Sequence, residues 1–201
     1  ILACLVRRGI TGEGGFVQVS LMESILDFQF EVLTTYLNDG HQLPQRSAIS
    51  NAHAYLAAPY GIYETADGYL ALAMGSIPVL GDLLDCPTLT EYADRETWFT
   101  QRDEIKQILV DHLRTKTTQY WLDILEPQDI WCADVLNWDR LFAHEGFQVL
   151  DMVQEVARDE NVTLDTLRCP IRIDGKRLFS RKGAPRIGQQ TEQIAAEFSL
   201  V

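Results

Sequence analysis

The chain has 201 residues, of which 46% are hydrophobic and 23% charged, a balance that is ordinary for a globular protein. Its formal net charge of −12 argues against a nucleic-acid partner and against an anionic membrane surface, because both are polyanions that would repel it. No apolar run approaches the ~20 residues of a membrane-spanning helix, so we expect a soluble protein without a membrane partner.

The cysteines and histidines do not form the patterns of a metal site. The four cysteines are far apart in the sequence: Cys4, Cys86, Cys132 and Cys169. A chain of this size does not need disulfide bonds to hold its core, so we predict free thiols in a reducing cytoplasm. The four histidines are also well separated, and we therefore predict no metal.

The first part of the chain indicates a helix, a strand and a second helix. Residues 1–8 are predicted to end a helix that Gly9 closes, and residues 16–19 alternate as a strand does. Ser20 and Glu23 have the spacing of a capping box, and apolar residues then recur at helical intervals. We therefore predict one long helix over residues 21–37, followed by a linker up to residue 57.

The middle of the chain begins with a hairpin signal. Two β-rich runs, residues 60–65 and 69–74, flank Asp67 and Gly68, a pair that tolerates the positive φ angles of a tight turn. Helices are predicted over residues 79–84, 97–113 and 119–125, the last one capped by Thr117 or Thr118. Residues 131–135 are predicted to form a short buried strand or an extended turn. We expect core positions for the four tryptophans: Trp98, Trp121, Trp131 and Trp138.

The last part of the chain mixes short elements. A helical turn is predicted over residues 138–143, a strand-containing region over 147–157, and a strand over 169–173 that turns at Asp174 and Gly175. A loop rich in Arg, Lys, Gly and Pro leads to a terminal helix over residues 191–198. The whole pattern predicts an α/β fold containing an α+β small domain, in which helices accompany an antiparallel hairpin.

The residues alone do not point to a reaction. The sequence contains no nucleophile elbow, phosphate-binding P-loop or zinc-protease helix motif. The glycine-rich run at residues 12–15 leads into the predicted strand instead of opening a helix, so it is read as a tight turn.

Five phrases in order do resemble one family. The segment Ala58-Pro59-Tyr60-Gly61 with Thr65-Ala66-Asp67-Gly68 is similar to the hairpin signature of the class III CoA-transferases, which include formyl-CoA and carnitine CoA-transferases and α-methylacyl-CoA racemases. Residues 1–5, 11–23, 131–137 and 184–191 resemble four further family segments. The chain departs from the pattern at Glu13, at Gln189 and Gln190, and at Trp131, where the family has Pro.

The resemblance implies the C-terminal part of the class III CoA-transferase fold. Residues 1–50 would be the end of a large domain with a linker helix, residues 51–157 a small domain, and residues 158–201 a segment that returns to the large domain. The family's nucleophile is an Asp placed just before the segment that matches Ile1–Leu5, so no residue of this chain is nominated as catalytic. The same missing half holds CoA in the family, and no tightly bound cofactor is implied.

The resemblance also implies substrates and partners. A CoA thioester and a carboxylic acid would be the substrates of the complete enzyme, and the chain alone is expected to be inactive. The family forms interlocked dimers, so a homodimer or a complementing N-terminal half is the expected partner. In this chain we expect Tyr60 and Gly61 to border the acyl pocket, although packing of this hairpin entry in the small-domain core explains them equally well. Two alternatives remain: part of a racemase of the same fold, or a non-catalytic interaction domain.

Overall fold

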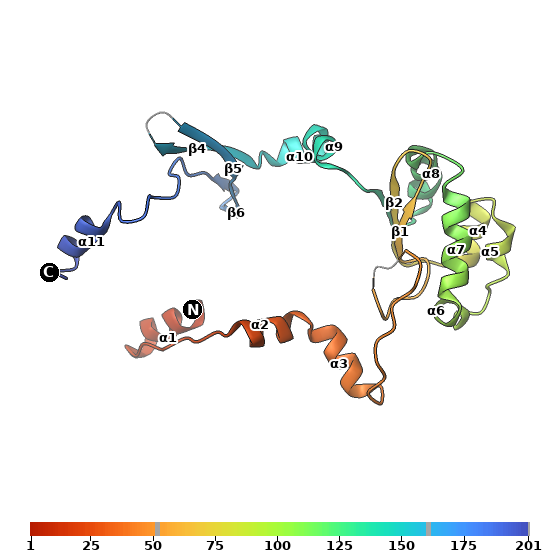
Figure 1. Ribbon diagram of the computed structural model, residues 1–201, viewed down its shortest axis with the longest axis horizontal. Coiled ribbons are helices and arrows are strands. Elements are labelled where there is room, and N and C mark those ends of the chain that lie inside the picture. Colours follow the sequence, from red (N-terminus) through yellow and green to blue (C-terminus); the bar gives the residue numbers. More distant parts are fainter. Residues whose placement is uncertain (51–52, 160–161, 201) are drawn as a thin grey trace. The chain divides into compact units, whose positions relative to one another are not determined.

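The computed structural model describes residues 1–50, 53–159 and 162–200, and divides into two compact units, residues 1–135 and 136–201 (Figure 1). Its elements are helices combined with small antiparallel sheets, which confirms the mixed α/β class. The proposed division into the end of a large domain, a small domain and a returning segment remains a prediction.

The first unit begins with three helices: α1 (Leu2–Thr11), α2 (Leu21–Phe28) and α3 (Phe30–Asn38). The prediction that Gly9 closes the first helix is wrong, because Gly12 adopts φ 77° and its N–H reaches the carbonyl of Arg8. The predicted capping box is present: Ser20 Oγ accepts the N–H of Glu23 and donates to its carboxylate.

Two further predictions for this region are wrong. Residues 16–19 form no strand, because an extended segment needs a neighbouring strand for its hydrogen bonds and none pairs with it in the described chain. The single helix over residues 21–37 is divided at Gln29, whose φ of −94° and ψ of 14° separate α2 from α3. None of the residues of these three helices is buried.

A three-stranded antiparallel sheet organises the rest of this unit, with the order β1 (Gly61–Glu64), β2 (Tyr69–Leu72), β3 (Cys132–Asp134). The helices that follow the hairpin are α4 (Ile77–Leu83), α5 (Pro87–Thr90), α6 (Thr97–Thr100), α7 (Arg102–Leu113) and α8 (Thr118–Leu125), and the 3-10 turn η1 (Glu126–Gln128) ends the series. The helix predicted over residues 97–113 is interrupted at Gln101, and the predicted cap of α8 is confirmed at Thr117, whose side chain accepts the N–H of Tyr120.

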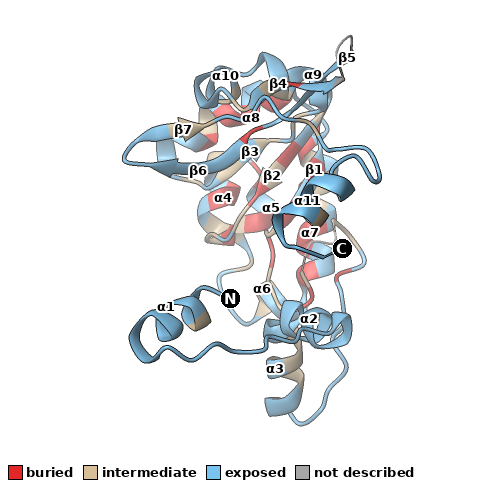
Figure 2. Ribbon diagram, turned by 90° about the vertical axis from the view of Figure 1, so that its left-hand side faces the viewer, coloured by how far each residue is buried: buried red, intermediate tan, exposed pale blue. Residues whose placement is uncertain are grey.

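The core of this unit lies between one face of the sheet and the helices. Tyr63, Leu70 and Leu72 from the sheet are at most 3% exposed, and they belong to one cluster with apolar residues of α4, α5, α7 and α8. Figure 2 shows the buried residues concentrated in these elements, whereas α2 is coloured as exposed and α1 as exposed apart from one intermediate residue. Because strand side chains alternate between faces, burying one face leaves the other face of β1, β2 and β3 open.

The second unit contains α9 (Trp138–Ala143), α10 (Glu145–Leu150), β4 (Val153–Asp159), β5 (Val162–Leu167), β6 (Cys169–Ile173), β7 (Lys176–Leu178) and α11 (Thr191–Glu197). The strands pair as two antiparallel hairpins, β4 with β5 and β6 with β7. The helical turn, the strand at residues 169–173 and the terminal helix follow the predictions. The region 147–157 contains a strand as predicted, since β4 begins at Val153, and its first four residues end α10.

One buried arginine holds this unit together. Arg168 is 3% exposed, and its guanidinium donates to the carbonyls of Leu150, Asp151 and Cys169, each at 2.7 Å. Two of these carbonyls stand at the end of α10, where unpaired carbonyls attract a cation. The guanidinium therefore joins the end of α10 to the start of β6.

Candidate functional site

The open face of the three-stranded sheet presents small side chains in its middle. Ile62, Ala71 and Ala133 are in register across β1, β2 and β3, so they project from the same face. By the same alternation, Tyr60, Ala73 and Trp131 follow on that face at the end of the sheet where Ala73 N–H donates to Trp131 O at 2.8 Å. The result is a floor of alanine methyl groups between larger side chains on the two outer strands.

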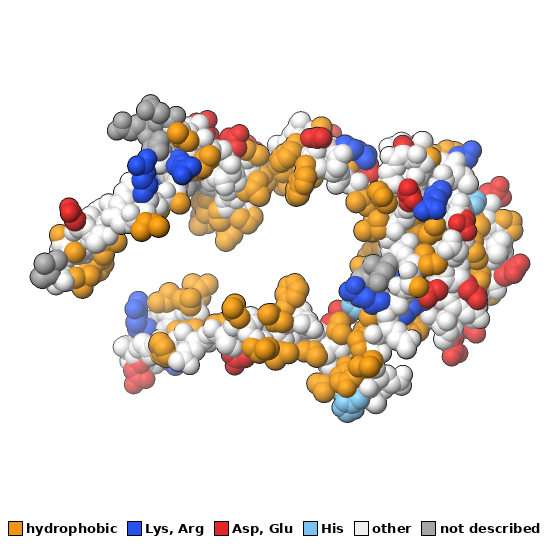
Figure 3. Space-filling view, in the orientation of Figure 1, with side chains coloured by type: hydrophobic (Ala, Val, Ile, Leu, Met, Phe, Trp, Pro, Cys, Tyr) orange, Lys and Arg blue, Asp and Glu red, His pale blue; other side chains and the backbone are white. Residues whose placement is uncertain are grey.

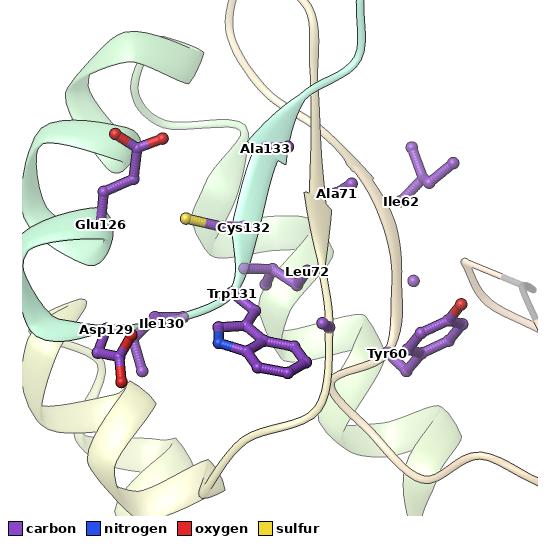
Figure 4. A pocket seen from close by; sticks show the side chains of 12 residues that line it. Tyr60, Ile62, Ala71, Leu72, Glu126, Asp129, Ile130, Trp131, Cys132 and Ala133 are labelled. Atoms are coloured by element: carbon purple, nitrogen blue, oxygen red, sulfur yellow. The ribbon is translucent and has the colours of Figure 1, made fainter. Parts of the chain in front are cut away.

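This floor lies in a cavity of about 640 Å³, within the range of small-molecule sites. Its lining comprises Tyr60, Gly61, Ile62, Ala71, Leu72, Ala73, Glu126, Asp129, Ile130, Trp131, Cys132 and Ala133. Figure 4 shows the rings of Tyr60 and Trp131 at the same end of the sheet, with Ala71 and Ala133 further along it. The cavity is thus lined mainly by apolar groups.

Gly61 has a steric reason to be glycine. A Cβ atom at this position would lie 2.7 Å from the carbonyl oxygen of Ser50, closer than such atoms approach in proteins. The linker before the hairpin crosses β1 here, and α7 fixes the linker in place. Asp103 Oδ1 accepts the hydroxyl of Ser47 at 2.6 Å and the N–H of Ala48 at 2.9 Å.

Two cations of α7 complete this attachment. The guanidinium of Arg102 donates to the carbonyls of Gln45 and Ala54, at 2.5 and 2.8 Å, and Lys106 donates to Ser50 O at 3.4 Å. Lys106 is 1% exposed, and its pKa is lowered by burial and by the nearby charge of Arg102. These contacts hold the linker against the strand that carries Tyr60 and Gly61.

The tip of the hairpin is attached to α8. The loop between the strands spans residues 65–68, and Asp67 is not among the described residues with positive φ, contrary to the tight turn predicted. Its carboxylate instead accepts the N–H of Thr118 at 2.8 Å, and the hydroxyls of Thr65 and Thr118 lie 2.7 Å apart beneath it. Asp67 therefore serves as an anchor for the hairpin and not as a catalytic group of this cavity.

The charged groups at the cavity are both acidic. Glu126, the first residue of η1, and Asp129, the residue that follows it, both line the cavity, and among the described lining residues there is no Lys or Arg. Cys132 also lines it, and burial together with the charge of Glu126 raises the pKa of this thiol above its usual value. A raised pKa leaves the thiol protonated at neutral pH, so Cys132 is a poor nucleophile.

Tyr60 and Gly61 both line the cavity, and their role toward an acyl group remains a prediction. Reasoning from sequence missed Trp131: it is 68% exposed, and Trp138 is 74% exposed, so the core positions expected for them are wrong. Trp121 is buried at 3%, as predicted, and Trp98 packs against the core. The sequence signal that could have singled out Trp131 was its departure from the Pro of the resembled family pattern.

Other site types find no support in the described residues. The four cysteines are free thiols, of which Cys86 is buried and Cys169 exposed. No group of three or more potential metal-ligating side chains occurs within the described ranges. Among the helices of these ranges, none combines the length and the apolar character that crossing a bilayer requires.

Comparison with known proteins gives consistent matches over the chain. The model of CoA-transferase family III matches residues 1–191. An acyl-CoA transferase of Fusarium pseudograminearum is 26% identical over 100% of this chain and 45% of its own length. A succinate–glutarate CoA-transferase of Agrobacterium fabrum is 25% identical over 100% of this chain and 51% of its own length. A succinyl-CoA:mesaconate CoA-transferase of Haloarcula hispanica is 28% identical over 82% of this chain and 42% of its own length.

Solved structures share the fold. Rv3272 from Mycobacterium tuberculosis superposes with a TM-score of 0.72 at 23% identity, over 95% of this chain and 50% of that one. A CAIB/BAIF family protein from Brucella suis gives a TM-score of 0.68 at 20% identity, over 98% and 51%. The chain spans about half the length of the curated relatives and structures it matches. With the family model matching residues 1–191 of 201, the chain belongs to CoA-transferase family III.

Proposed function

We propose that this chain is the C-terminal half of a class III CoA-transferase whose complete enzyme moves CoA between carboxylic acids. The observation that carries the proposal is the family match over almost the whole chain, together with relatives named as CoA-transferases that are about twice as long. The substrates are then a CoA thioester and an acceptor acid, and no cofactor is bound tightly.

The chemistry proposed for the complete enzyme is covalent. An Asp carboxylate from the other half attacks the thioester carbonyl and expels the CoA thiolate, which leaves an acyl–aspartyl anhydride. The thiolate then attacks the aspartyl carbonyl, releases the donor acid and forms an aspartyl-CoA thioester. The acceptor carboxylate reverses these two steps. None of these covalent bonds is assigned to a residue of this chain, which by itself is inactive.

The contribution of this chain is a wall of the acyl site. Tyr60 and Gly61 line the cavity over the alanine floor, and Arg102, Asp103 and Lys106 hold the linker that passes behind Gly61. A cavity of about 640 Å³ suits an acyl group with part of the CoA arm. We therefore propose that the small domain positions the acyl end of the thioester for attack.

A partner for the exposed apolar surface is part of the proposal. Leu5, Phe16, Ile25 and Phe28 are between 45% and 93% exposed, and Figure 3 shows hydrophobic side chains along α1 and α2. Contiguous apolar surface of this kind marks association. The partner proposed is a second copy of the chain or the complementing N-terminal half. The four free thiols favour a reducing compartment, which we propose is the cytoplasm.

Activity of two proteins tests the proposal. The 201-residue chain and the complete gene product are incubated with acyl-CoA donors and a panel of acids, and the thioesters are separated by chromatography. We expect exchange with the complete product and none with the chain. Epimerisation of a 2-methylacyl-CoA without exchange would replace the transferase by a racemase of the same fold. If the complete product catalysed neither exchange nor epimerisation, a non-catalytic interaction domain would be the better assignment.

A further inference from the structure

The cavity on the open sheet face has a shape and a charge that select among acyl groups. We propose that it receives an uncharged, apolar acyl group and excludes an acyl group that carries a second carboxylate, with Trp131 as the residue that determines this specificity. The inference rests on the proposed function, since it takes the ligand to be the acyl end of a CoA thioester.

The shape follows from the three strands. Neighbouring strands lie ~4.8 Å apart, so the backbones of β1 and β3 are separated by roughly 10 Å across β2. Ala71 and Ala73 fill little of this width. Figure 4 shows the larger side chains of Tyr60 and Trp131 on opposite sides of β2, at one end of the sheet. A trough of this width accepts one alkyl chain or one aromatic ring lying on the alanine methyl groups.

Trp131 has the properties of a ligand contact. It is 68% exposed although it carries one of the largest apolar surfaces available to a protein, and it borders a cavity instead of open solvent alone. A group placed against its ring would remove much of this apolar surface from water.

The charge of the lining argues against a dicarboxylate. Glu126 and Asp129 line the same cavity as Trp131, and no Lys or Arg is present among the described lining residues to pair with a second carboxylate. An acyl group ending in a carboxylate would therefore meet two like charges. Two of the relatives reported above are named for such diacids, succinate with glutarate and succinyl-CoA with mesaconate. We infer that this chain takes a different acyl class.

A matched pair of thioesters tests the selection. Butyryl-CoA and succinyl-CoA have four-carbon acyl groups, and only the second ends in a carboxylate. Binding of each to the complete gene product, which also supplies the half proposed to hold CoA, is measured by equilibrium dialysis, and the donor preference of the same protein is measured as kcat/KM. We expect butyryl-CoA to be favoured by about tenfold or more. Equal binding, or a preference for succinyl-CoA, would overturn the proposal.

Variants distinguish the contribution of the Trp131 ring from that of the two carboxylates, Glu126 and Asp129. Trp131→Ala should weaken the binding of butyryl-CoA about tenfold, whereas Trp138→Ala, which removes a similarly exposed tryptophan from the other unit, should leave this binding unchanged. The double variant Glu126→Gln, Asp129→Asn should reduce the difference in binding affinity between butyryl-CoA and succinyl-CoA. It should do so without weakening the binding of butyryl-CoA. If both tryptophan variants changed the binding of butyryl-CoA equally, the role of Trp131 would be contradicted. If the double variant kept the same difference in affinity between the two thioesters, the role of the two carboxylates would be contradicted.

Ala73→Leu tests the site without removing a contact. The larger side chain should occupy the trough and so block the binding of butyryl-CoA. Circular dichroism checks that the variant is folded. Binding that survives in a folded Ala73→Leu chain would place the thioester elsewhere. A complete gene product that binds butyryl-CoA in this manner but exchanges no CoA would overturn the proposed function and leave this binding assignment intact.

Discussion

The carboxylate of Asp67 accepts the backbone N–H of Thr118 at 2.8 Å, which joins the tip of the β1–β2 hairpin to the first turn of α8. This N–H is one of the donors that a helix leaves without an internal partner, and a carboxylate there is also favoured by the helix dipole. The pKa of Asp67 is lowered, chiefly by this bond, with further lowering by the hydroxyls of Thr118 and Thr65.

The lowered pKa predicts how stability depends on pH. The pKa of Asp103 is lowered as well, first by the hydroxyl of Ser47 and then by the N–H of Ala48. A carboxylate whose pKa is lower in the folded state stabilises it fully above the unfolded pKa, near 3.9, and loses this effect as the pH falls through the folded value. We expect the free energy of unfolding to fall as the pH drops below about 4.

Denaturant unfolding followed by circular dichroism between pH 2.5 and 7 checks this. The variant with Asp67→Asn and Asp103→Asn should be less stable than the parent at pH 7 and should lose less stability on acidification. Asp123→Asn, on the exposed side of α8, is the matched control, because its carboxylate accepts the side-chain N–H of Gln119 in the same helix and does not tie α8 to the hairpin. Parallel pH profiles for the parent and the double variant would contradict the roles given to Asp67 and Asp103.

A methyl group at residue 61 should destabilise the fold. Gly61→Ala places its Cβ within 2.7 Å of Ser50 O and 3.2 Å of Ser50 Cβ, so the linker held by α7 must shift. Overpacking of this kind costs about 1–3 kcal/mol. Gly75→Ala is the control, because nothing lies within 4 Å of its Cβ position. Chemical unfolding midpoints that are lowered equally by both substitutions would show that the close approach at Gly61 is not the cause.

The predictions from sequence succeeded where local chemistry decides. The cap at Thr117, the capping box at Ser20 and Glu23, and the turn at residues 174–175 follow from side chains within a few residues of each other. The strand over residues 16–19 failed because pairing depends on a neighbour that local sequence does not specify. Trp131 was misplaced for a related reason: apolarity cannot distinguish a core position from the wall of a cavity.

The attachment of the linker to α7 was also beyond the sequence. Asp103 and Ser47 are 56 residues apart, and the contact between them arises only when α7 lies beside the strand that follows the linker. Tyr60 and Gly61, which we expected to border an acyl pocket, both line the cavity, and their role toward an acyl group stays a prediction. The alanine floor could not be predicted, because it depends on the register of β1, β2 and β3.

Replacing Arg168 by lysine should loosen the second unit although the charge is kept. The planar guanidinium donates hydrogen bonds to the carbonyls of Leu150, Asp151 and Cys169, and one ammonium group cannot reproduce this geometry. Hydrogen bonds to charged groups contribute about 1.5–3 kcal/mol, so a loss of that order is expected. Hydrogen exchange of residues 146–178 should accelerate. Arg172→Lys, at an exposed position of β6, is the control, and matching exchange rates in the two variants would refute the role of Arg168.

The exposed apolar segments predict association. Phe28 is 93% exposed in a helix without buried residues, so we expect the chain to sediment as a dimer or larger species, and Phe28→Asp to shift it toward monomer. Met74→Asp, at an exposed apolar position of the first unit, is the control. A monomer at all concentrations, with residues 1–44 resistant to protease, would mean that this segment covers its own apolar surface.

The bonds from α7 hold the linker at two points, one on each side of its approach to β1. Arg102 donates to the carbonyls of Gln45 and Ala54, and the carbonyl oxygen of Ser50, between them in sequence, lies close to Gly61. One guanidinium therefore fixes both points together. The position of the backbone that leads to Tyr60 thus depends on a helix that follows it much later in the sequence.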